Sequence, residues 1–78
     1  MPNQTLPDSI KGGLTLAEAM RQAVRLLTSQ QISVRADIED VAAAYIAEKW
    51  DAIPATASPD LIVKSCAKIL LQSIKATL

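Results

Sequence analysis

The sequence predicts an all-α fold, a bundle of three helices, from two observations. Apolar residues recur at helical spacing in three segments, at about 15–29, 34–51 and 59–77. No stretch of useful length alternates apolar and polar residues in the way that a half-buried strand does. The last two segments are separated by Pro54 and Pro59, which disfavour helix at the residues that precede them.

The chain has 78 residues, which is enough for one small domain. We place this domain at 14–78 and expect 1–13 to be a disordered arm, because this segment holds prolines, glycines and few apolar residues. Chains of this size bury only about 60% of their unfolded surface, so their folds are marginally stable unless a disulfide, a metal or oligomerisation adds stability. The single cysteine excludes an internal disulfide, and we expect oligomerisation to provide the additional stability.

The segment at 59–77 has the clearest helix start and the widest apolar surface. Ser58 is expected to cap the free amides, Pro59 suits the first helical position, and Asp60 complements the positive end of the helix dipole. The polar residues fall in one narrow sector of the helix, and the apolar arc covers more than half of its circumference. This helix therefore needs neighbours on at least two sides.

The segment at 15–29 predicts a regular amphipathic helix. Thr15 and Glu18 have the spacing of a capping box. One apolar stripe follows, with members at helical intervals: Leu16, Met20, Ala23 and Leu27.

The segment at 34–51 has two apolar stripes, and Ser33 or Asp37 is its expected cap. The central stripe, which we expect to form the core, consists of Val34, Ile38, Val41, Ala42 and Tyr45. A second stripe beside it consists of Ile46, Trp50 and Ile53. Two stripes indicate that this helix contacts more than one neighbour.

The same helix carries an acidic ridge of four residues, Asp37, Asp40, Glu48 and Asp51. We interpret this ridge as a solvated face, or as one that pairs with the lysines of the chain itself. Two alternatives stay open at this stage, because carboxylates at such spacing can share a divalent cation or dock a basic partner.

Composition argues against catalysis and against cofactors. The chain has no histidine, which excludes serine–histidine catalysis and, with a single thiol, argues against a zinc site. Cys66 lies on the apolar arc of its helix and is expected to be a buried hydrophobe. We therefore predict no enzyme activity, cofactor or metal. No signal peptide or run of 18 apolar residues is present, so we expect a cytoplasmic protein without a membrane span.

The function that these features favour is protein–protein interaction, as a small helical adaptor, scaffold or regulatory binding protein. The first expected partner is a second copy of the chain, because the last helix has more apolar surface than two neighbours easily cover. The residues assigned to that homodimer interface are Ile46, Trp50, Ile53, Ile62, Ile69 and Leu71.

The alternative is a small DNA-binding regulator. Arg21 and Arg25 on the first helix and Arg35 in the turn after it would contact the phosphates. This alternative is less favoured, because the helix that would enter the groove carries a net negative charge and the whole chain is formally neutral.

Overall fold

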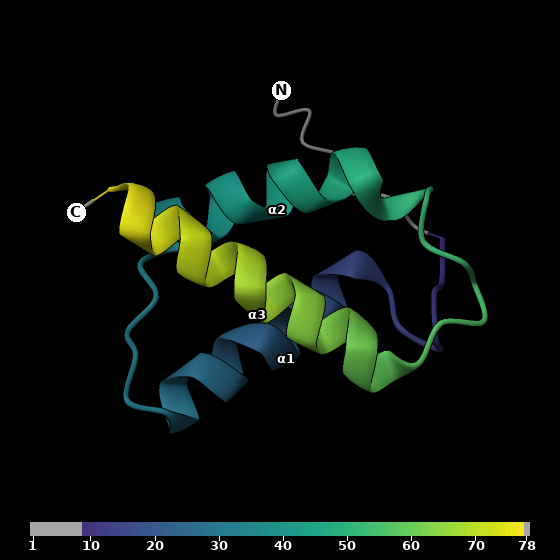
Figure 1. The fold of residues 1–78 in the computed structure, drawn as a ribbon, viewed down its shortest axis with the longest axis horizontal. Coiled ribbons are helices and arrows are strands. Elements are labelled where there is room, and N and C mark those ends of the chain that lie inside the picture. The colour runs from purple at the N-terminus through teal and green to yellow at the C-terminus, as the bar shows by residue number, and fades with distance from the viewer. Residues whose placement is uncertain (1–8, 78) are drawn as a thin grey trace.

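The structure is a computed structural model that describes residues 9–77, and it consists of three helices that pack on one another (Figure 1). Helix α1 spans Leu16–Ser29, α2 spans Ala36–Trp50 and α3 spans Pro59–Ala76. Within the described residues there is no strand, only an isolated bridge between Lys11 and Leu14. The prediction of an all-α, three-helix fold is confirmed.

Local interactions fix both ends of α1. The capping box is confirmed, since Thr15 Oγ1 accepts from the Glu18 amide at 3.2 Å and Glu18 Oε1 accepts from the Thr15 amide at 3.0 Å. At the other end the amides of Gln31 and Ile32 donate back to the carbonyls of Thr28 and Leu27, each at 2.9 Å. This is a Schellman motif, and its left-handed residue is Gln31, with φ 66°, where glycine is usual.

The predicted cap of α2 is wrong, since the residue at its N-cap is Arg35, which makes no side-chain capping bond. Ser58 lies at the N-cap of α3 with Pro59 directly after it, as predicted, but the Ser58 side chain makes no capping bond. Asp37 lies inside the first turn of α2, where its carboxylate binds the Arg35 guanidinium at 2.7 Å and accepts from the Ile38 amide at 3.0 Å.

The core is built by all three helices and is entirely aliphatic except for Trp50, whose side chain has no exposed surface. The other members of the buried cluster are Leu16, Ala19, Met20, Ala23, Leu27, Ala42, Ile46, Ile62, Cys66, Ala67 and Leu70. No charged or polar residue is buried in the described part of the chain. Burial of apolar area is therefore the main stabilising term.

The rotation of α2 differs from the prediction. Of the central stripe, which was expected to face the core, Ile38 and Ala42 are buried, but Val41 is 61% exposed and Tyr45 is 48% exposed. The buried residues instead follow one another at intervals of four: Ile38, Ala42, Ile46 and Trp50. An aromatic side chain such as that of Trp50 buries about 150–250 Å², so the rotation that covers it outweighs the one that would cover Tyr45, whose hydroxyl prefers water.

The residues before α1 form a strap against the linker between α2 and α3. Trp50 Nε1 donates to the Ser9 carbonyl at 2.9 Å, and the Gly12 amide donates to the Ala55 carbonyl at 3.0 Å. The prediction of a disordered arm did not anticipate these contacts of residues 9–13. The rest of that predicted arm, residues 1–8, lies outside the described residues.

We expect the two glycines of the strap to respond differently to alanine. Both have positive φ, so Gly13→Ala, whose new Cβ would meet open space, should lower the free energy of unfolding by roughly 1–2 kcal/mol through backbone strain alone. Gly12→Ala should lower it clearly further, because its Cβ would lie 2.5 Å from the Ala57 carbonyl oxygen. Urea unfolding of both variants measures the difference. Equal losses would show that the strap does not lie against the linker.

The Schellman motif gives a second prediction, of the opposite sign. Gln31→Gly should raise the free energy of unfolding by about 1 kcal/mol, because glycine adopts the left-handed conformation without the Cβ penalty. The matched control is Gln30→Gly, at φ −96°, which should be neutral or destabilising since only the unfolded chain gains freedom there. If both variants shift the thermal midpoint in the same direction, the assigned conformation of Gln31 is wrong.

Candidate functional site

The structure divides the six residues predicted at the dimer interface into two groups. Ile46, Trp50 and Ile62 are at most 3% exposed and belong to the core of the single chain. The other three, Ile53, Ile69 and Leu71, are half-buried and pack against that core. The fold of one chain thus covers half of the predicted interface without a partner.

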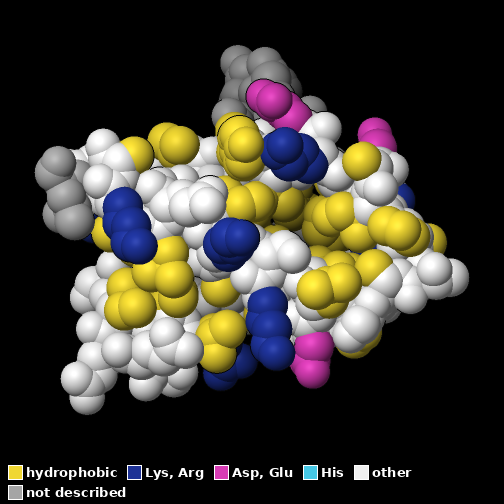
Figure 2. Space-filling model, viewed as in Figure 1, with side chains coloured by type: hydrophobic (Ala, Val, Ile, Leu, Met, Phe, Trp, Pro, Cys, Tyr) yellow, Lys and Arg dark blue, Asp and Glu magenta, His cyan; other side chains and the backbone are white. Residues whose placement is uncertain are grey.

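Four large apolar residues of the described part are exposed, and three of them, Val41, Tyr45 and Leu61, lie between α2 and α3, whereas Ile10 lies before α1. Val41 and Tyr45 of α2 share a hollow of about 200 Å³ with Ile69 of α3. Toward the linker a second hollow of about 400 Å³ is lined by Ile53 and by Leu61, which is 60% exposed. We call these two hollows together the α2–α3 groove. Figure 2 shows this side of the molecule, where apolar patches alternate with basic side chains.

The groove also contains a cation. The Lys49 ammonium lies 5.0 Å from the centre of the Tyr45 ring, one helical turn away on α2, which is the distance of a cation–π contact. This contact holds the exposed ring against its own helix. Tyr45 is nevertheless 48% exposed, so about half of its surface stays open to solvent.

Rows of opposite charge lie on the outer faces of the two helices that form the groove. The outer face of α3 carries Lys64, Lys68 and Lys75, all exposed, and the outer face of α2 carries the acidic ridge, also exposed. Among residues 9–77 the one salt bridge joins Arg35 to Asp37, which belongs to the ridge. The ridge does not pair with the lysines of α3 within the described part of the chain. No group of three or more metal-ligating side chains gathers in this described part.

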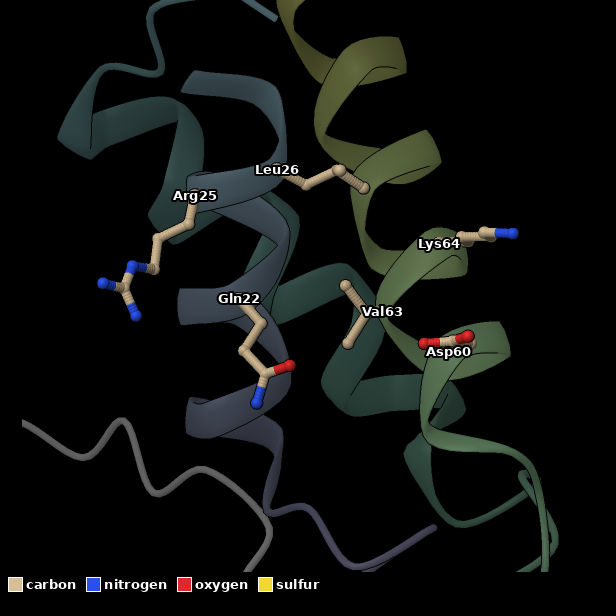
Figure 3. A pocket seen from close by; sticks show the side chains of 6 residues that line it. All are labelled: Gln22, Arg25, Leu26, Asp60, Val63 and Lys64. Atoms are coloured by element: carbon tan, nitrogen blue, oxygen red, sulfur yellow. The ribbon is translucent and has the colours of Figure 1, made fainter. Parts of the chain in front are cut away.

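A further cleft, of about 560 Å³, separates α1 from α3 (Figure 3). Leu26 and Val63 extend toward each other across it, whereas Arg25 and Lys64 extend away on opposite sides. The two cationic groups at this cleft therefore do not converge on a common point. A catalytic or ligand site requires such convergence.

The three arginines of the DNA-binding alternative are exposed but do not form one surface. Arg21 lines a hollow between α1 and α2 beside Glu39 and Asp40. Arg25 lies at the α1–α3 cleft, and Arg35 is held by Asp37 at the start of α2. Two of the three cations thus have carboxylates as neighbours.

Cys66 is 2% exposed on the inner face of α3, as the apolar arc predicted. Burial raises the pKa of its thiol to about 11, because the thiolate would be poorly solvated in the core. A thiol with such a pKa is not a nucleophile near neutral pH.

None of the three helices combines the length and the apolar character that crossing a bilayer requires, as judged over residues 9–77. Comparisons with protein-family models, with curated proteins and with solved structures find no match to this chain. The assignment of a function therefore depends on the chemistry of the surface.

Sequence reasoning missed Val41, Tyr45 and Leu61 as surface residues. The one signal that could have found the first two is the interval-of-four series that ends at Trp50, because burying the largest side chain fixes the rotation of α2. Leu61 carried no such signal, since its exposure depends on how α3 lies beside the linker.

The burial of Cys66 predicts a pH dependence of stability. In the unfolded chain the thiol loses its proton near its ordinary pKa of 9.0, whereas the folded chain retains it up to about pH 11. The stabilisation from the buried neutral thiol is fully present below pH 9.0 and is lost as pH rises toward about 11, so wild-type stability should fall in this window relative to Cys66→Ala. Urea unfolding at a series of pH values measures this. Parallel curves for the two proteins would contradict the burial of the thiol.

Proposed function

We propose that this chain is a small helical protein–protein interaction module and that it acts through the α2–α3 groove. The observation that carries the proposal is the exposure of Val41, Tyr45 and Leu61 along one line, where they take no part in the core. Soluble domains seldom leave neighbouring large apolar side chains exposed without a partner to cover them.

The shape of the groove supports a helical or extended protein segment as the occupant. Its two hollows follow the direction of the helices, so a second helix would lie along them with side chains in both. Tyr45 would be the anchor, because aromatic side chains with a polar tip are enriched at the centre of interfaces. An adaptor, a scaffold and a regulatory binding protein would each use such a contact.

The DNA-binding alternative has less support. The carboxylates of Glu39 and Asp40 beside Arg21, and that of Asp37 on Arg35, would meet phosphates unfavourably. The lysines of α3 form the more continuous basic row, but apolar side chains in the neighbouring groove would stay exposed on DNA.

Photo-cross-linking tests the proposal without knowledge of the partner. A benzophenone analogue of phenylalanine at position 45 should cross-link to a protein under ultraviolet light in the native host, because the ring lies in the groove. The same analogue at position 22 is the control, since Gln22 is exposed on α1, away from the groove. A defined protein band at position 45 alone is expected. Equal or absent cross-linking at the two positions would contradict the groove as the contact surface.

A further inference from the structure

The charged rows that border the α2–α3 groove are arranged by level along the helices. Helices α2 and α3 run antiparallel (Figure 1), and the hollows show which of their residues share a level. Tyr45 shares one hollow with Ile69, and Lys49 shares the other with Leu61 and Ser65, so these parts of the two helices lie side by side. One row of charge follows the outer face of each helix.

Counting along both helices from these levels matches three of the four acids of the ridge with a lysine each. Because both helices rise about 1.5 Å per residue, Asp40, which also lines the hollow toward α1, lies level with Lys75. By the same count Glu48 lies near the level of Lys68, and Asp51 near that of Lys64. Within one chain the members of each match lie on opposite sides of the α2–α3 pair or at its end, and no such ion pair forms among the described residues.

A twofold axis along the groove would bring these matched groups together. Such a rotation keeps each residue at its level and exchanges the two sides of the groove, so α2 of one copy faces α3 of the other. Each acidic ridge then meets the lysine row of the other copy, and the apolar side chains of the two grooves meet at the axis. An axis across the helices would place acid on acid and lysine on lysine, which is unfavourable.

We propose that the occupant of the α2–α3 groove is a second copy of this chain, in the twofold arrangement with its axis along the groove. This inference rests on the proposed function and specifies its partner. The contact is isologous: every acid–lysine match occurs twice, and both grooves are covered in one step. It differs from the interface predicted from sequence, because Ile46, Trp50 and Ile62 stay in the core of each copy.

Lys49 is unfavourable for this twofold dimer, and its substitution therefore distinguishes the dimer from another occupant of the groove. Lys49 lies in the groove itself, so the twofold axis would bring it near Lys49 of the other copy. Like charges at that point weaken association. Lys49→Gln should therefore tighten self-association a few-fold. An acidic helix from another protein in the same groove would bind Lys49→Gln more weakly than wild type.

Reversal of each charged row gives the main test. The acidic variant carries Lys64→Glu, Lys68→Glu and Lys75→Glu, so that both borders of its groove are negative. Facing its own copy, it should associate roughly tenfold or more weakly than wild type, because like charges then lie opposite each other.

The basic variant carries Asp40→Lys, Glu48→Lys and Asp51→Lys and should weaken to a similar extent. A one-to-one mixture should form a heterodimer, because each negative border then faces a positive one. Sedimentation velocity over a dilution series measures the association of wild type, of each variant and of their mixture. Circular dichroism checks that each variant is folded.

The outcomes separate this inference from the proposed function. A wild-type chain that stays monomeric to millimolar concentration overturns the second copy, and so does a mixture that fails to associate. In either case a cross-link from position 45 to another protein leaves the groove as an interaction surface. If a triple variant does not fold, Lys49→Gln decides: weaker or unchanged self-association overturns the proposal.

Discussion

The burial of Trp50 is the interaction on which the rest of the structure depends. Its ring is the largest side chain in an otherwise aliphatic core, and its indole N–H reaches the Ser9 carbonyl at the strap. A buried indole needs such a partner, since an unsatisfied N–H in the core would be costly. The residue thus joins the packing of the helices to the position of the chain before α1.

Placing Trp50 inside also decides which side of α2 is left outside. The residues on the same face of α2 are also buried, namely Ile38, Ala42 and Ile46. The edge of α2 toward α3 then carries Val41 and Tyr45. The acidic ridge comes to lie opposite the core, where its carboxylates are hydrated and raise no desolvation cost. A single large side chain therefore determines both the core face and the chemistry of the free face.

The fold was predictable from sequence because its signals are local. The capping box at Thr15, the proline at the start of α3 and the stripe of α1 each depend on residues within a few positions of one another. The rotation of α2 was not predictable in this way, because apolar residues cover much of its circumference and only contact with other helices selects a face. The strap needs a bond between Ser9 and Trp50, 41 residues apart, which no local pattern encodes.

In the twofold dimer that we propose, the separation of charge between α2 and α3 would prevent open-ended growth of a neutral chain with exposed apolar residues. A head-to-tail contact would use one charged row of each copy, leave the other free, and so continue into a chain of molecules. The twofold contact would use both rows of both copies and cover both grooves, which would close the assembly at two. Because each copy would form twice as many charge matches in the closed dimer as at an open end, the surface that favours association would also limit it.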